Sequence, residues 1–201
     1  MSREYIDSYF DETQEIINRL DRPELLKAIE ILKSTRDKGG RLFILGVGGS
    51  ATNASHAVND FRKIAGIESY TPVDNVSELT ARTNDDGFET IFIEWLKTSK
   101  LGPDDMVMVF SVGGGSETTS KNLVLAMQYA KDVGANIVAV VSRDGGAARE
   151  MAEVCVLVPV VSDERIIPHA EGWQAVLWHL MVNAIKLPAK STHSRKNQVN
   201  E

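Results

Sequence analysis

The sequence lacks several features that would assign it to a specialised class of protein. Its 201 residues contain a single cysteine, Cys155, which excludes an internal disulfide and a zinc site built from several cysteines. No window approaches the run of about eighteen apolar residues that a membrane span needs, and the acidic start MSREYIDSYFDE has no apolar signal core. Basic residues are not in excess either, since the formal net charge is −6 and the pI is near 5.3. We therefore expect a soluble, cytoplasmic protein with no general attraction to nucleic acid or to anionic membranes.

What the chain does have is enough apolar material for one compact domain. Hydrophobic residues make up 43% of the sequence, and two independent domains would be cramped at this length. Apolar residues recur at helical spacing in two stretches within residues 1–38, which predicts a helical extension at the start of a single domain over residues 1–187. The polar segment 188–201 is predicted to be a disordered tail.

Short apolar runs alternate with helical patterns along the rest of the chain. Runs at residues 41–47, 105–112, 136–142 and 154–161 predict buried strands, with a weaker strand at 70–73. Helical patterns cover residues 50–64, 88–100, 116–133, 145–152 and 171–185. This alternation predicts an α/β fold with a doubly wound parallel sheet in a three-layer αβα arrangement, and ligands are expected at the carboxyl ends of its strands.

Two of the predicted strands end in glycine-rich turns that open helices, LGVGGSATN at 45–53 and SVGGGSETTSKN at 111–122. Backbone amides and hydroxyl groups at such turns favour a phosphate group. Neither turn has the glycine spacing of a dinucleotide fingerprint or the lysine of a nucleoside triphosphate loop, so we expect no nucleotide cofactor. A single turn of this kind could equally reflect helix-to-strand packing, but two on one sheet edge are more specific.

The segments GVGGSATNASHAVNDF, TNDDGFETIF, SVGGGS, VSRDGG and HAEGWQAVLWHLMVNAI resemble, in order and spacing, a known family. It is the sugar isomerase (SIS) domains of the sedoheptulose 7-phosphate isomerase, or phosphoheptose isomerase, group. The resemblance runs from about residue 5 to residue 186 and implies a flavodoxin-like fold. It also implies isomerisation of sedoheptulose 7-phosphate to a glycero-manno-heptose 7-phosphate, in a homotetramer whose active sites lie between subunits.

The same resemblance assigns roles to individual residues. Its departures from the family are Val47 for an asparagine, Asn53 for an aspartate, and Gly113 for a serine of the phosphate loop, and these leave the exact substrate open. Asp60 stands for the family's base glutamate and Glu171 for its glutamine. The implied substrate and phosphate ligands are Ser50, Asn53, Asn84, Asp85, Ser111 and Ser116, the implied catalytic residues are Asp60 and His179, and the implied zinc ligands are His56, Asp60, Glu171 and His179.

Helix geometry supports part of this set and constrains another part. His56 and Asp60 are four residues apart, so they project from one face of a helix that leaves the first glycine turn. Glu171 and His179 are eight residues apart, or about 12 Å in one straight helix, too far to share an ion readily. We therefore expect Glu171 at the start of its helix or in the loop before it, with Pro168 and Gly172 as the break. The two histidines and two carboxylates would then suit Zn²⁺ or another divalent ion, and His169 is a spare ligand.

Three functions are compatible with these residues. The first is an aldose–ketose isomerase that uses Asp60 and His179 as acid and base through an enediol. The second is a non-catalytic module that binds a phosphosugar or a partner, as some relatives associate with the bacterial replication initiator. The third is an isomerase of a modified heptose, or of a sugar of another length, in secondary metabolism or capsule synthesis.

Overall fold

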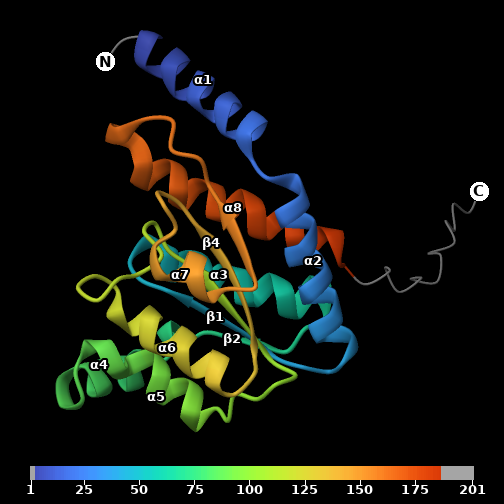
Figure 1. Ribbon diagram of the computed structural model, residues 1–201, viewed down its shortest axis with the longest axis vertical. Coiled ribbons are helices and arrows are strands. Elements are labelled where there is room, and N and C mark those ends of the chain that lie inside the picture. Colours follow the sequence, from blue (N-terminus) through green and yellow to red (C-terminus); the bar gives the residue numbers. More distant parts are fainter. Residues whose placement is uncertain (1–2, 187–201) are drawn as a thin grey trace, which may run out of the picture.

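The computed structural model describes residues 3–186, and they form one parallel sheet covered by helices on both faces (Figure 1). The five strands lie in the order β2-β1-β3-β4-β5, and each pairs with its neighbours in parallel. This order is the doubly wound arrangement that the alternating pattern predicts. The strands are β1 (Leu42–Gly46), β2 (Ser69–Tyr70), β3 (Met106–Phe110), β4 (Asn136–Val141) and β5 (Val154–Leu157).

Each central strand contributes side chains to a core on either side of the sheet. In β3, Met106, Met108 and Phe110 belong to one buried cluster, whereas Val107 and Val109 belong to the other. This alternation is the period-two geometry of a strand. Strands buried on both faces need apolar residues at every position, which is why the strands read as continuous apolar runs.

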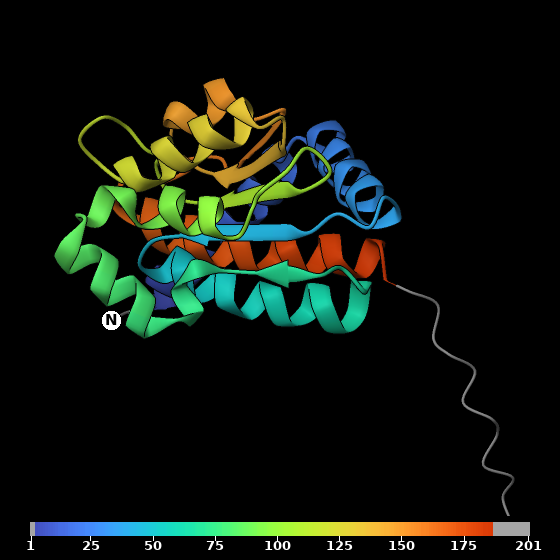
Figure 2. The same cartoon turned by 90° about the horizontal axis from the view of Figure 1, so that it is seen from below.

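The helices divide between the two faces, as the view from below shows (Figure 2). One face is covered by α2, α3 and α8, with Ile16 of α1 inserted into the same core, and the other by α5, α6 and α7. The helices are α1 (Arg3–Arg19), α2 (Arg22–Asp37), α3 (Gly49–Asp60), α4 (Val76–Asp85), α5 (Ile91–Thr98), α6 (Lys121–Asp132), α7 (Gly146–Met151) and α8 (Ile166–Ala184). None of the helices in the described residues is long and apolar enough to cross a membrane.

Three helices differ from the prediction, and the predicted strands at 70–73 and 154–161 are shorter, at Ser69–Tyr70 and Val154–Leu157. Helix α6 begins at Lys121 rather than at residue 116, because Ser116 and the residues after it form a loop. Helix α4 was not predicted, and it has no buried residue that would give a periodic signal. Helix α8 begins at Ile166, five residues before the expected start. The predicted tail 188–201 lies outside the described residues.

Candidate active site

A large cleft lies at the carboxyl ends of β1 and β3, where the two glycine-rich turns meet. A doubly wound sheet of this strand order has its topological switch point between these two strands, and ligands bind there. The cleft has a volume of about 800 Å³. Its lining residues are Val47, Ser50, Ser111, Val112, Gly113, Gly115, Ser116, Thr119, Ser120, Arg143, Asp144, Gly146, Val160, Asp163, Ile166, Ile167 and Glu171.

The second turn presents its hydroxyl groups in a defined arrangement. The Oγ of the buried Ser111 accepts a hydrogen bond from the amide of Gly114 at 3.0 Å. The Oγ of Ser116 accepts from the amides of Thr118 and Thr119 at 3.3 and 3.1 Å. Because both oxygens act as acceptors, each hydroxyl keeps its own proton to donate to an anion in the cleft.

The first turn carries a negative group that the sequence did not place there. The carboxylate of Glu171 lies against Gly49 at the start of α3, where a Cβ on Gly49 would be only 2.4 Å from its Oε2. Ser50, the next residue of α3, is buried and lines the same cleft. The first turn is therefore a less favourable place for a phosphate than the second, because the carboxylate would repel it.

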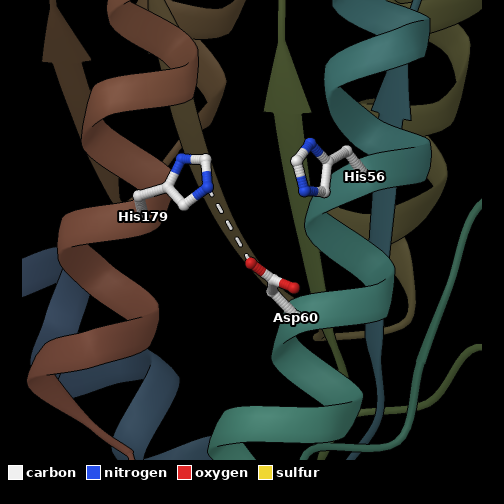
Figure 3. Close-up of side chains that lie close together, drawn as sticks. All are labelled: His56, Asp60 and His179. Carbon is white, nitrogen blue, oxygen red and sulfur yellow. Dashed lines mark ion pairs between the residues drawn. The ribbon is translucent and has the colours of Figure 1, made fainter.

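A second cluster of chemically active side chains lies farther along α3 and α8 (Figure 3). His56 and Asp60 of α3 face His179 of α8, and their potential ligand atoms lie within 4.8 Å of one another. The Nε2 of His179 is 3.9 Å from Oδ2 of Asp60. The side chain of His179 is 47% exposed and that of Asp60 is 15% exposed, so the cluster combines a partly buried carboxylate with two accessible imidazoles.

The imidazole of His179 is held by two contacts with its own helix. Its Nδ1 lies 2.7 Å from the carbonyl oxygen of Ala175. Because a carbonyl oxygen can only accept, Nδ1 donates to it, and Nε2 is the ring nitrogen that faces Asp60. A carbonyl partner on the second ring nitrogen is typical of histidines that bind metals. The buried Trp178 stacks on His179 and packs edge-on against His56, at centroid distances of 3.4 and 4.7 Å.

The helix break that the four-ligand metal set requires does not form. Pro168 lies in the first turn of α8, where a missing amide hydrogen costs no intrahelical bond, so the helix continues through Gly172. Glu171 and His179 then belong to one helix about 12 Å apart, and Glu171 is outside the cluster of His56, Asp60 and His179. The spare ligand His169 is also elsewhere, since its ring is 4% exposed and bonds to Glu12 on α1 at 2.8 Å.

The remaining predicted ligands have different surroundings. The side-chain amide of Asn53 donates to the carbonyl of Glu171 at 2.9 Å and to Oε1 of Gln174 at 3.0 Å, and so it joins α3 to α8. Asn84 and Asp85 end α4 and bond to each other at 2.7 Å. Neither of them lines the main cleft within residues 3–186, and their role as substrate ligands stays a prediction.

Sequence reasoning missed Arg143, which lines the cleft, and Trp178, whose ring contacts both histidines. Arg143 is part of the quoted VSRDGG segment, and its positive charge next to a glycine pair was an available signal. Trp178 gave no such signal, because an apolar aromatic residue on a helix is most often a core residue.

A family model described as "SIS domain" matches residues 8–142. The chain belongs to the SIS domain family. The phosphoheptose isomerase of Geotalea daltonii is 31% identical over 149 residues, which cover 72% of this chain and 75% of that protein. The lincomycin biosynthesis protein LmbN of Streptomyces lincolnensis is 32% identical over 164 residues, 76% of this chain, but the match spans only 58% of LmbN.

Among solved structures, the phosphoheptose isomerase of Francisella tularensis matches with a TM-score of 0.78. The match covers 92% of this chain and 98% of that one, at 24% sequence identity. At this identity the likeness shows a shared fold, which agrees with the α/β sheet that the sequence predicts.

Proposed function

We propose that the protein is an aldose–ketose isomerase that converts sedoheptulose 7-phosphate to D-glycero-D-manno-heptose 7-phosphate through an enediol. The relatives named phosphoheptose isomerase support this reaction class. The observation that carries the proposal is the approach of His179 to Asp60 across two helices, at 3.9 Å, beside a cleft with phosphate-binding character. The cleft and the histidine cluster are joined by α3, in which Ser50 and His56 are about 9 Å apart.

The reaction moves two hydrogens and no heavy atom. A base removes a proton from C1 of the ketose, next to the C2 carbonyl, and the electron pair forms the C1–C2 double bond of the enediol. The proton is then delivered to C2, while a second proton passes from O1 to O2 and leaves the carbonyl at C1. The carboxylate of Asp60 suits the carbon proton transfer. His179 suits the transfer between the oxygens, because its Nδ1 is bonded to the carbonyl of Ala175 and its Nε2 has no partner in its own helix.

The donor set also fits a divalent ion such as Zn²⁺. Two imidazoles and a carboxylate are common zinc ligands, and three protein ligands leave a position open for substrate. His56, Asp60 and His179 would hold the ion. A bound ion would polarise the substrate carbonyl and stabilise the enediolate. With Glu171 outside the cluster, we expect Glu171→Gln to leave metal affinity unchanged and His56→Ala to reduce it.

A second copy of the chain would cover exposed apolar side chains of α1 and α8. Phe10 of α1 is 63% exposed, and Val176 and Leu180, which flank His179 on α8, are 50% and 43% exposed. Exposed apolar residues gathered along two helices favour an interface. We propose a homotetramer with the active sites between subunits, and light scattering that gives a monomer would contradict it.

Two variants test the proposed reaction. Asp60→Asn and His179→Ala should each lower turnover of sedoheptulose 7-phosphate by about a hundredfold or more, the usual effect of losing a general acid or base. A matched control is Asp132→Asn, an exposed carboxylate at the end of α6 on the other side of the sheet. Turnover close to wild type in Asp60→Asn or in His179→Ala would exclude that residue as a general acid or base. Metal analysis of protein purified without a histidine tag, finding no stoichiometric divalent ion, would contradict the zinc proposal.

The similarity to LmbN favours one second candidate, an isomerase of a related sugar phosphate in secondary metabolism. A panel of ketose phosphates decides between the two, since the proposed reaction requires sedoheptulose 7-phosphate to be turned over at least as well as the others. Binding across the panel without turnover would instead favour the non-catalytic phosphosugar-binding module.

A further inference from the structure

Arg143 is the one basic side chain among the described residues that line the main cleft. It lies in the turn between β4 and α7, and it is exposed. Within residues 3–186 it makes no hydrogen bond or ion pair, unlike Arg41, Arg82 and Arg165, whose guanidinium groups are bound to carboxylates. Its guanidinium is therefore available to a ligand in the cleft.

The backbone around Arg143 is fixed against the second glycine turn. The α-carbon of Gly146 is so close to that turn that a Cβ would lie 2.3 Å from the carbonyl oxygen of Gly113 and 2.6 Å from that of Gly115. The amide of Ala147 donates to the Gly115 carbonyl at 3.0 Å. The turn that carries Arg143 is thus packed backbone to backbone against the turn that carries the serine hydroxyls.

The side chain of Arg143 passes over Gly113. A Cβ on Gly113 would lie 3.8 Å from Cδ of Arg143, which is ordinary van der Waals contact. Arg143 itself has φ of +55°, a left-handed conformation that glycine or asparagine adopts more easily. An arginine at a backbone position that disfavours it is consistent with a role for its side chain.

We propose that Arg143 binds the phosphate group of the substrate, together with the hydroxyls of Ser111 and Ser116. A guanidinium matches two phosphate oxygens at once, which makes it the strongest kind of phosphate contact in a protein. The carboxylate of Glu171 at the first turn repels the phosphate and so directs it to the second turn. Asp144 and Asp163 also line the cleft, so Arg143 carries the one positive side-chain charge among the lining residues that the structure describes. This inference rests on the proposed function.

The test compares three variants. Arg143→Asn removes the charge and introduces a residue that tolerates a left-handed backbone. Arg143→Lys keeps the charge but lacks the paired N–H donors of the guanidinium. Arg22→Ala is the matched control, because Arg22 is exposed on α2, lacks a bonded partner in the described part of the chain and does not line the cleft. The measurements are the KM and kcat for sedoheptulose 7-phosphate, and calorimetric binding of inorganic phosphate and of unphosphorylated sedoheptulose at fixed ionic strength.

We expect Arg143→Asn to raise the KM and weaken phosphate binding by about ten- to a hundredfold, the worth of a charge-assisted contact. The kcat and the binding of unphosphorylated sedoheptulose should change little, Arg143→Lys should fall between, and Arg22→Ala should match wild type. Unchanged phosphate affinity in Arg143→Asn, or an equal loss for the unphosphorylated sugar, would overturn the inference. If wild type turns over no sedoheptulose 7-phosphate, the proposed function fails, and the phosphate-binding arm still decides the role of Arg143.

Discussion

Glu12 attaches α1 to the start of α8, and its ionisation gives a prediction that can be measured without a substrate. Its carboxylate accepts hydrogen bonds from two nitrogens of Arg165 and pairs with His169, which stacks on Tyr9 at 4.6 Å. The side chain is 12% exposed. The bonds from Arg165 lower the pKa of Glu12 from 4.5 to about 2 against the opposing effect of burial, with a further contribution from His169.

The sign of the pH effect follows from that lowered pKa. A carboxyl that is more acidic in the folded state stabilises the fold above its unfolded pKa, and this stabilisation is lost as the pH falls from about 4.5 towards about 2. A difference of this size corresponds to about 3 kcal/mol without screening. Solvent around α1 reduces it, and we expect about 1 to 2 kcal/mol.

The assay is chemical denaturation of Glu12→Gln and wild type between pH 7 and pH 3.5. Glu12→Gln should lose about 1 to 2 kcal/mol of unfolding free energy at pH 7, and the difference should shrink below pH 4.5 as the Glu12 carboxyl of the unfolded wild-type chain takes up a proton. Glu15→Gln is the control, because its ion pair with Arg19 is half exposed and should contribute well under about 1 kcal/mol. A loss for Glu12→Gln that is no larger than the control's, or that does not depend on pH, would refute the reasoning.

Four further results are expected. Gly114→Ala should lower the free energy of unfolding by about 3 kcal/mol or more, because φ of Gly114 is +73° and a Cβ there would lie 1.9 Å from the carbonyl oxygen of Gly145. Gly172→Ala, with open space around it in α8, should instead stabilise the protein by about 0.5 to 1 kcal/mol, and thermal unfolding of the pair checks both signs. Burial raises the pKa of the Cys155 thiol to about 11. Alkylation of Cys155 at pH 8 should therefore be about a hundredfold slower than alkylation of a free thiol. Equal alkylation rates would contradict this burial. In the ketose phosphate panel, turnover should fall for sugars shorter than seven carbons, because the phosphate cleft and the cluster of His56, Asp60 and His179 lie apart along α3 and α8. Efficient turnover of a five-carbon ketose phosphate would argue against this separation.

Much of the fold could be predicted because its strands are buried on both faces. The run DMVMVFSV has an apolar residue at nearly every central position, and only a doubly covered strand requires that pattern. Boundaries were harder where polar loops follow apolar runs, as at the start of α6, and where a helix buries nothing, as in α4. The early start of α8 was missed because Pro168 was interpreted as a break rather than as a first-turn residue.

The candidate site was predictable only in part, for a physical reason. His56 and Asp60 share a helix face, so helical spacing alone places them together. His179 is more than a hundred residues away in sequence, and its position opposite Asp60 depends on how α3 and α8 pack. The position of Arg143 likewise depends on two glycine turns that contact backbone to backbone, which no periodicity in the sequence encodes.

The packing of α3 against α8 also explains how one pair of helices can serve both ends of a substrate. Glu171 contacts Gly49 at the cleft, the amide of Asn53 bonds to α8 in the middle, and His179 faces Asp60 farther along. Contacts in this order show that the two helices run in the same direction away from the cleft. Each helix therefore separates a residue that lines the main cleft from a residue of the cluster of His56, Asp60 and His179 by a fixed number of turns. Glu171 and His179 occupy the two ends of this spacing, about 12 Å apart. In the proposed reaction, the carboxylate of Glu171 would therefore act on the cleft, and the acid–base chemistry would belong to His179 and Asp60.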